Sequence, residues 1–186
     1  MIMLTEFKKY IEKHNLIEKG DKILLALSGG VDSMVLAKLL LAVSRQLSAN
    51  SQLFFAHCNF HLRGEDSNRD ERFVTEFAKD NGIELFVKHF DTEAYAKEKS
   101  LSIEMAAREL RYSWFEELKN IHNINKVALA HHGDDQIETF FINFLRGSGI
   151  KGLKGMKAQN GFYIRPLLWS NRNQIETYAR ANDIQW

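Results

Sequence analysis

The chain has 186 residues, of which 45% are hydrophobic and 26% charged, a composition typical of one soluble domain with a substantial core. No apolar run approaches the ~20 residues of a membrane span, and the charged, amphipathic N-terminus is unlike a signal peptide. The single cysteine, Cys58, excludes an internal disulfide and a cysteine-ligated metal cluster. We therefore expect a cytoplasmic protein with no membrane partner.

The net charge of +1 conceals an uneven distribution along the chain. Residues 139–175 include six basic residues and no acidic one. This layout indicates a polyanion such as RNA bound on one face, although a solvated loop surface would have the same composition. The six residues are Arg146, Lys151, Lys154, Lys157, Arg165 and Arg172.

The first predicted elements are a helix at about 5–14, a buried strand at Ile23–Leu27 and a helix after the loop Ser28–Ser33. Strand, glycine turn and helix in this order form a phosphate site. The two glycines let backbone N–H groups approach an anion, and the helix N-terminus adds partial positive charge. Ser28 and Ser33 add hydroxyl donors.

Asp32 lies inside this expected anion cradle. The loop has neither the lysine of GxxxxGK[ST] nor the glycine spacing of GxGxxG. A carboxylate beside phosphates is repulsive unless a cation bridges them, so Asp32 predicts Mg²⁺. The alternative is a tight turn in which Asp32 only caps the helix.

A second buried strand is predicted at 53–57, and polar residues follow it. Because ligands in open α/β sheets bind beyond the carboxyl ends of the strands, these side chains are expected near the first loop. They are His57, Asn59, His61 and Arg63. Each of them alone is as well explained by a structural role.

The middle of the chain predicts a helix at 65–82, a strand at 84–90 and a helix at 92–99. Ser102 can cap a longer helix that ends near His122. Its core side is predicted to be Ile103, Ala106, Ala107, Leu110, Trp114 and Leu118. On another side Glu104, Arg108 and Arg111 form a stripe, which a salt-bridged surface would explain equally well.

A fourth strand at 126–130 runs into His131–Thr139 and repeats the first unit: strand, glycine turn, then a helix with acids in its first turn. Asp135 and Glu138 share a face of that helix, where they could also simply complement its dipole. Zinc is disfavoured, because the adjacent His131 and His132 lack the i, i+4 spacing of a helical histidine pair.

The remaining chain predicts a glycine-rich mobile loop at 146–155, a short fifth strand at 162–165 and a final helix at 173–182. The fifth strand stops at Pro166. The apolar last residues suggest that a further domain follows.

Four stretches together resemble the tRNA(Ile)-lysidine synthetases of the pyrophosphate-loop (PP-loop) ATPase superfamily. The first, SGGVDS, is shared across the superfamily, whereas the others are specific in combination. The four are SGGVDS at 28–33, His57-x-Asn59-x-His61-Leu62-Arg63-Gly64, Glu104-x-x-Ala107-Arg108-x-x-Arg111-Tyr112, and AHHGDDQIET at 130–139. LRGSG at 145–149 and RPLL at 165–168 add to the resemblance.

The resemblance implies a Rossmann-like, doubly wound α/β fold with a five-stranded parallel sheet in the order 3-2-1-4-5. It implies ATP-dependent ligation of L-lysine to C2 of the wobble cytidine of tRNA(Ile) with a CAU anticodon, through an adenylated intermediate. ATP and Mg²⁺ are the implied cofactors, and a homodimer is compatible with it. Because the family's C-terminal tRNA-binding domains are not in this sequence, residues 1–186 are expected to form the single catalytic domain.

The resemblance also implies roles for individual residues. Asp32 and Asp135 would bind Mg²⁺ and approach the lysine amine, with Glu138 helping to hold the amine or the metal. Arg108 and Arg111 would neutralise the phosphate or the adenylated base. Nucleotide binding would involve Ser28, Gly29, Gly30, Val31, Asp32, Ser33, His57 and Asn59. RNA contacts would involve Arg63, Arg146, Lys151 and Lys154.

Other functions share the phosphate loop. A tRNA thiolase would need Cys-x-x-Cys pairs, which this sequence lacks. Amidotransferase-coupled synthetases of NAD or GMP would leave the basic stretch unexplained. A non-catalytic adenine-nucleotide binder would not need the second set of acids.

Overall fold

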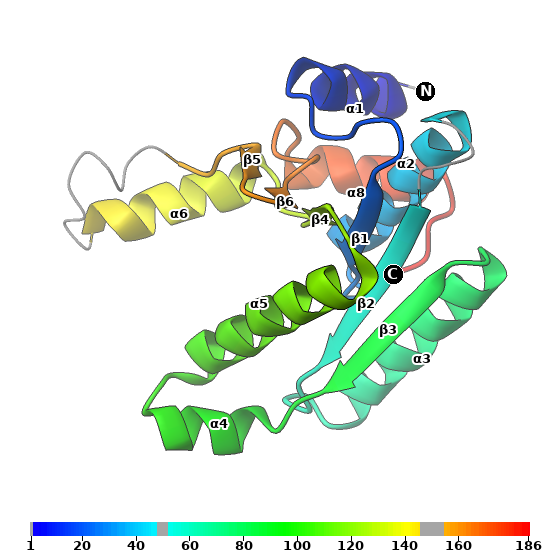
Figure 1. Ribbon diagram of the computed structural model, residues 1–186. Coiled ribbons are helices and arrows are strands. Elements are labelled where there is room, and N and C mark those ends of the chain that lie inside the picture. Colours follow the sequence, from blue (N-terminus) through cyan, green and yellow to red (C-terminus); the bar gives the residue numbers. More distant parts are fainter. Residues whose placement is uncertain (1, 48–51, 146–154) are drawn as a thin grey trace.

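Within the described residues 2–47, 52–145 and 155–186, the computed structural model has six strands in one sheet, in the order β3-β2-β1-β4-β6-β5 (Figure 1). Five of them are parallel: β1 (Lys22–Ala26), β2 (Gln52–Asn59), β3 (Glu84–His89), β4 (Lys126–Ala128) and β6 (Tyr163–Ile164). The short β5 (Gln159–Asn160) pairs antiparallel with β6 at the edge.

The predicted order of the parallel strands, 3-2-1-4-5, is confirmed with β6 as the fifth. The strand β5 was not expected, so the sheet has one strand more than predicted. The two residues of β5 are polar and too few to show an alternating pattern.

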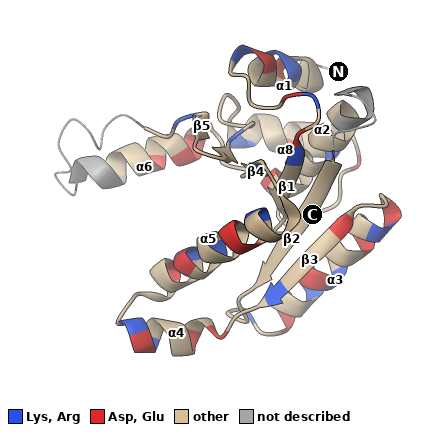
Figure 2. Ribbon diagram, in the orientation of Figure 1, with Lys and Arg blue, Asp and Glu red and all other residues tan. Residues whose placement is uncertain are grey.

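The helices follow the predicted sequence of elements, with small shifts at their ends. α1 begins at Ile2 rather than near Thr5, because Met3 extends its buried face. Figure 2 shows acidic and basic residues interspersed along α3, whose outer face is in solvent. The helices are α1 (Ile2–Lys13), α2 (Val31–Leu47), α3 (Glu65–Asp80), α4 (Thr92–Lys99), α5 (Ile103–His122), α6 (Gly133–Leu145) and α8 (Arg172–Ala181).

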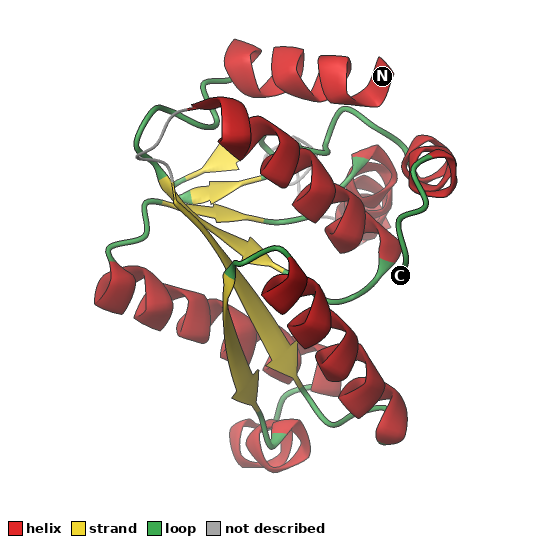
Figure 3. Cartoon of the chain, turned by 90° about the vertical axis from the view of Figure 1, so that its right-hand side faces the viewer, coloured by secondary structure: helices red, strands yellow, loops and turns green. Residues whose placement is uncertain are grey.

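Helices cover both faces of the sheet (Figure 3). Successive residues of β1 point to opposite faces, so Ile23 and Leu25 join the larger core and Leu24 joins the smaller one. The larger core contains buried residues of α1, α2, α3 and α8, and the smaller core is formed mainly with α5. This is the doubly wound arrangement that the sequence predicts.

The buried face of α5 differs from the prediction at two residues. Phe115 is buried although it was not predicted to be, and the side chain of Ile103 is 41% exposed. Ile103 is the first residue of α5, where the helix has not yet reached the sheet. No helix in the described ranges is long and apolar enough to cross a membrane.

The order of the strands reverses at β1, which lies between β2 and β4. The chain leaves β1 toward one edge of the sheet and returns through β4 toward the other. At such a reversal the loops after neighbouring parallel strands separate, and a crevice opens at their carboxyl ends. The loops after β1 and β4 lead into α2 and α6, whose first turns carry Asp32 and Asp135.

Candidate active site

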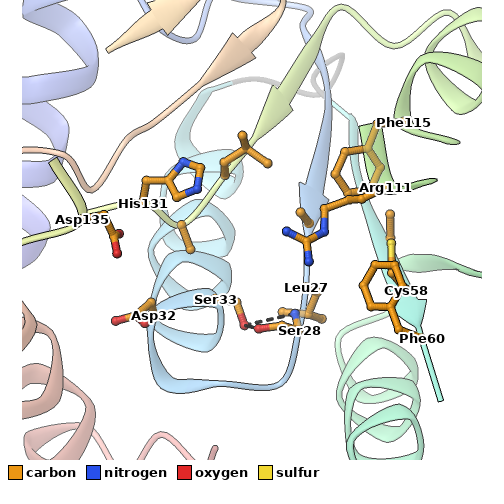
Figure 4. A pocket seen from close by; sticks show the side chains of 14 residues that line it. Leu27, Ser28, Asp32, Ser33, Cys58, Phe60, Arg111, Phe115, His131 and Asp135 are labelled. Atoms are coloured by element: carbon orange, nitrogen blue, oxygen red, sulfur yellow. Dashed lines mark hydrogen bonds between the residues drawn. The ribbon is translucent and has the colours of Figure 1, made fainter. Parts of the chain in front are cut away.

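The loop after β1 is shaped by its own serine hydroxyls. The Ser33 hydroxyl donates to the Gly30 carbonyl oxygen at 2.9 Å, and the Ser28 hydroxyl donates to Ser33 Oγ at 3.1 Å. The Ser28 N–H also donates to Ser33 Oγ, at 3.2 Å. The serines were expected to face a phosphate, and in this structure they hold the turn between β1 and α2 (Figure 4).

Gly29 takes a backbone conformation that favours glycine, with φ at +91°. A Cβ at this position would lie at ordinary contact distance, 3.5 Å, from Val74 of α3. The loop therefore packs closely on α3 and turns sharply into α2. This geometry brings the N-terminus of α2 to the carboxyl end of the sheet.

A cavity of about 330 Å³ lies directly beyond this loop. Figure 4 shows Asp32 and Asp135 on one side of it and Arg111, Cys58 and Phe60 on the other. The ends of β1, β2 and β4 and the starts of α2 and α6 contribute to its walls. Its lining residues are Ala26, Leu27, Ser28, Asp32, Ser33, Ala56, Cys58, Phe60, Arg111, Phe115, Leu129, Ala130, His131 and Asp135.

Asp32 is the acid nearest the loop, and its environment is strongly polar. Its Oδ1 is buried without a hydrogen-bond partner among the described residues, 3.7 Å from His132 Nε2. Burial raises the pKa of Asp32, Arg172 and His132 oppose that effect, and Asp135 adds to it. Asp135 is oriented by the backbone, since its Oδ2 accepts from the His132 N–H at 2.8 Å.

Arg172, at the start of α8, joins the two acid-bearing helices. Its Nη1 donates to Asp32 Oδ2 at 2.7 Å, and its backbone N–H donates to Asp134 Oδ2 at 2.8 Å. Asn171 and Gln174 form a capping box that begins α8 at this point. From the sequence, Arg172 is distinguished only as one cation of the basic stretch. The signal that could have identified it is its position at a helix start after RPLL, but its partners lie far away in the chain.

Of the two predicted arginines, the structure places Arg111 in this cavity and Arg108 outside it. Arg111 lies over the Phe60 ring, 5.3 Å from its centroid, and also contacts Cys58. Arg108 is exposed and lies over the Tyr112 ring at 4.8 Å, in a separate shallow hollow with Met105 and Glu109. The two residues share a helix but occupy different surroundings.

Comparison with known proteins agrees with this geometry. Residues 2–186 match the family model described as the PP-loop domain. The chain belongs to the PP-loop domain family. It is 51% identical over 172 residues to the tRNA(Ile)-lysidine synthase of Bacteroides thetaiotaomicron, covering 92% of this chain and 39% of that protein. It is 44% identical over 184 residues to the tRNA(Ile)-lysidine synthase of Thermosipho africanus, covering 99% of this chain and 42% of that protein.

Solved structures show the same fold at low sequence identity. The U34-tRNA thiolase NcsA from Methanococcus maripaludis, with its [4Fe-4S] cluster, matches with a TM-score of 0.80 at 22% identity, over 98% of this chain and 64% of that one. NAD+ synthetase from Burkholderia pseudomallei matches with a TM-score of 0.53 at 14% identity, over 96% and 71%. This PP-loop chain spans about two fifths of the length of the curated relatives it matches.

The acids of the PP-loop domain suit Mg²⁺. This ion is usually held by one or two carboxylates together with substrate phosphates, rather than by a cage of protein ligands. Asp32 and Asp135 line one side of the cavity, and Asp32 Oδ1 has no hydrogen-bond partner among the described residues. In the same residues no group of three or more His, Cys, Asp or Glu could hold a metal alone. The donor set therefore fits a metal shared with phosphates.

His57 and Asn59 are buried and bonded to the protein. His57 Nδ1 lies 2.8 Å from the Leu27 carbonyl oxygen, and Asn59 Nδ2 donates to Glu71 Oε2 at 2.7 Å. Both line an adjoining cavity of about 340 Å³. That cavity shares Ser28, Cys58, Phe60 and Arg111 with the first. A nucleotide contact of His57 and Asn59, as predicted, would therefore be made in this adjoining cavity.

His131, on the β4 side of the cavity, is held as a neutral ring. The Arg165 Nε–H donates to His131 Nδ1 at 3.2 Å, so the ring proton belongs on Nε2. Burial, with Arg165 as the next cause, lowers the pKa of His131 to about 4. The sequence suggests His131 only as a disfavoured zinc ligand. Its burial beside Arg165 could not be predicted from the sequence, because the two residues lie 34 positions apart.

The remaining predicted residues do not line the first cavity, although Arg63 lines the adjoining one. Glu138 is exposed on α6, and Arg63 pairs with Asp70 of α3. Arg165 is buried and also donates to the Lys157 carbonyl oxygen, so it is not the surface cation that the basic stretch suggested. The predicted RNA contacts Arg146, Lys151 and Lys154 lie outside the described residues, as does the predicted loop 146–155 except for Gly155.

Proposed function

We propose that this PP-loop domain catalyses ATP-dependent attachment of L-lysine to C2 of the wobble cytidine of tRNA(Ile) with a CAU anticodon. The observation that carries the proposal is the meeting of the Ser28–Ser33 loop with Asp135 and Arg111 in one cavity. The relatives named tRNA(Ile)-lysidine synthase, at 51% identity over 92% of the chain, support the choice of substrate.

The reaction has two balanced steps. The cytidine C2 oxygen attacks the α-phosphorus of ATP, the bond from that phosphorus to its bridging oxygen breaks, and pyrophosphate leaves. The lysine amine then attacks C2, loses a proton, and AMP leaves with the former C2 oxygen.

Each part of the cavity has a task in these steps. The loop N–H groups and the N-terminus of α2 bind the phosphates, and Arg111 faces the charge that develops on the oxygens of the α-phosphate. Asp32 and Asp135 would hold Mg²⁺, which neutralises the phosphates when it is bound. Phe60 and Phe115 form apolar walls, and Asp135 attracts the lysine ammonium group, with Glu138 as a further acid outside the cavity on the same helix.

Two alternatives are less well supported. A thiolase that uses an iron–sulfur cluster needs thiolates, whereas Cys58 is the single cysteine of these 186 residues. Burial also raises the pKa of the Cys58 thiol to about 12, which keeps it protonated. A non-catalytic nucleotide binder would have no need for Asp135 opposite the phosphate loop. As parts of the same proposal, we infer a cytoplasmic location, and a homodimer stays a prediction.

The test is incubation with ATP, Mg²⁺, isotopically labelled lysine and an unmodified tRNA(Ile) transcript, followed by mass analysis of the anticodon fragment. Added mass of one lysine less one water, with equal amounts of AMP and pyrophosphate, supports the proposal. Asp32→Asn is the control, because it keeps the shape of the side chain but loses the charge, and it should abolish AMP formation. Added sulfur would indicate a thiolase, and ATP binding without AMP would indicate a mere binder.

A further inference from the structure

Arg172 makes side-chain contacts that the proposed reaction has not yet used. Its Nη1 lies 2.7 Å from Asp32 Oδ2 and its Nε lies 2.8 Å from Glu176 Oε1. The side chain is 47% exposed, although it reaches from α8 to Asp32 at the start of α2. Its backbone N–H separately anchors α8 to Asp134. The contact with Asp134 is made by the backbone, and those with Asp32 and Glu176 are made by the side chain. A substitution of Arg172 therefore removes only the contacts of the guanidinium.

The Asp32 carboxylate depends on Arg172 for its direct ion pair. Its other oxygen is buried without a hydrogen-bond partner among the described residues, and His132 Nε2 is 3.7 Å away. His132 is itself 9% exposed in its side chain, and its Nδ1 also has no partner in the described chain. These unpartnered atoms show a polar site arranged for a group that is not part of the chain.

Mg²⁺ and Arg172 would compete for the same carboxylate. A metal at Asp32 displaces the guanidinium, and the phosphates that arrive with the metal offer that guanidinium a new partner. Planar guanidinium groups bind phosphate oxygens through paired N–H donors, so the exchange keeps the arginine charge compensated. Because the guanidinium is a rigid plane, it would move as a unit from Asp32 to the ligand, and Glu176, which now accepts from Nε, is the partner that it can keep or exchange in that movement.

We propose that Arg172 is a phosphate-binding residue that holds Asp32 in the nucleotide-free protein and binds the terminal phosphates of ATP once Mg²⁺ takes Asp32. This deepens the proposed function and rests on it for the identity of the nucleotide. Arg172 contacts Asp32 on the acidic side of the cavity, whereas Arg111 lies on the opposite side with Cys58 and Phe60 (Figure 4). Arg172 thus serves the terminal phosphates and Arg111 the α-phosphate side.

The test compares Arg172→Gln with Arg180→Gln. Arg180 lies on the same helix and also pairs with Glu176, at 3.1 Å, but has no contact with Asp32. Both variants lose one positive charge and one partner of Glu176. Titration calorimetry with Mg²⁺ measures the Kd for ATP and for AMP, which lacks the terminal phosphates. Circular dichroism melting checks that each variant folds, and Arg172→Lys serves as a second variant if Arg172→Gln does not.

For Arg172→Gln, ATP binding should weaken by about 10- to 100-fold, as expected for removal of a charged hydrogen bond, while AMP binding changes less than about twofold. The Kd of Arg172→Lys for ATP should lie between those of the wild type and Arg172→Gln. Arg180→Gln should match the wild type for both nucleotides. Unchanged ATP affinity in Arg172→Gln, an equal loss for AMP, or an equal loss in Arg180→Gln would overturn the assignment. Failure of the proposed function is a separate result: a wild type that binds ATP but forms no lysine adduct on tRNA.

Discussion

At the scale of single residues, the cavity separates two arginines that the sequence motif treats alike. Arg111 lies in the cavity over Phe60, whereas Arg108 is exposed over Tyr112. The motif contains both because it records spacing along a helix. Which of them faces the ligand depends on how α5 rotates onto the sheet, and Phe115 and Leu118 fix that rotation by packing into the smaller core.

We therefore expect different outcomes for two conservative substitutions. Arg111→Lys should lower the rate of AMP formation by roughly 10²-fold, because a point charge cannot replace a guanidinium fork at a developing phosphate charge. Arg108→Lys should change the rate and the free energy of unfolding little, because exposed charges contribute little. Single-turnover kinetics measure the rate of AMP formation, and urea unfolding measures the free energy of unfolding. A larger rate loss in Arg108→Lys would reverse this assignment.

His131 gives a pH-dependent prediction for stability. Its pKa falls from 6.5 to about 4 on folding, through burial first, then Arg165, with Arg108 and Arg111 also lowering it and Asp135 opposing. Between pH 4 and pH 6.5 the unfolded chain binds more protons at this residue than the folded chain does. The contribution of the neutral His131 to the free energy of unfolding is therefore complete above pH 6.5 and is lost as the pH falls toward 4. His131→Asn cannot titrate, although its oxygen can still accept from Arg165.

The wild type should consequently lose about 1 to 2 kcal/mol more stability than His131→Asn between pH 7 and pH 5. Urea unfolding of both proteins at the two pH values measures this difference. Parallel losses in the two proteins would show that His131 titrates normally in the folded chain.

At the scale of elements, the phosphate loop depends on the conformation of Gly29. Alanine at φ near +90° is strained by about 1–2 kcal/mol, whether or not there is space for its Cβ. Gly20 has a similar φ of +88° with nothing within 4 Å of an added Cβ, and it lies before β1 rather than after it. The two glycines are therefore a matched pair.

Gly29→Ala and Gly20→Ala should lose similar stability in urea unfolding. Only Gly29→Ala should lose ATP affinity, because relief of the strain turns the loop N–H groups away from the phosphates. Calorimetric titration with ATP measures the second effect. If both variants bind ATP as the wild type does, the loop conformation is not what binds the phosphates.

The elements also show what the sequence could and could not predict. β1, β2 and the helices of the larger core were predictable, because their apolar periodicity is dictated by burial on one or both faces. The fifth parallel strand, β6, was predicted at 162–165, but the hairpin that it forms with β5 was not, since a two-residue strand carries no period. The Asp32–Arg172 pair was not predictable either, because it joins residues 140 positions apart through the packing of α8 on α2.

At the scale of the whole molecule, the basic stretch offers fewer cations to RNA than its composition suggests. Arg165 is buried against His131, and Arg172 is paired with Asp32 and Glu176. Four of the six cations remain as candidates for RNA phosphates: Arg146, Lys151, Lys154 and Lys157. Of these only Lys157, which is exposed, lies within the described residues.

We expect this chain to hold RNA weakly, through two to four phosphates. The logarithm of its affinity should fall with the logarithm of salt concentration by about 0.7 to 0.9 for each phosphate that the protein neutralises. Changing Lys151, Lys154 and Lys157 to Ala should flatten that slope by about one for each phosphate that is no longer neutralised. Filter binding at several salt concentrations measures it.

A control triple variant removes Arg69, Arg72 and Lys79, which are exposed on α3. It loses the same net charge and should keep most of the wild-type slope. Equal slopes in both triple variants would show that only overall charge matters, and that the basic stretch is ordinary solvated surface.

The central position of β1 has a consequence for how the chain is made. β1 pairs with β4, and the Lys22 N–H donates to Asn125 Oδ1 at 2.6 Å, across 103 positions of sequence. At about 5–20 residues per second, a ribosome needs roughly 5 to 20 s to make that interval. Throughout this time β1 can pair only with β2. The apolar side chains of α2 that pack against α8 also remain uncovered, because α8 has not yet been made. Nascent chains that end before β4 should therefore fail to retain ATP and should engage chaperones.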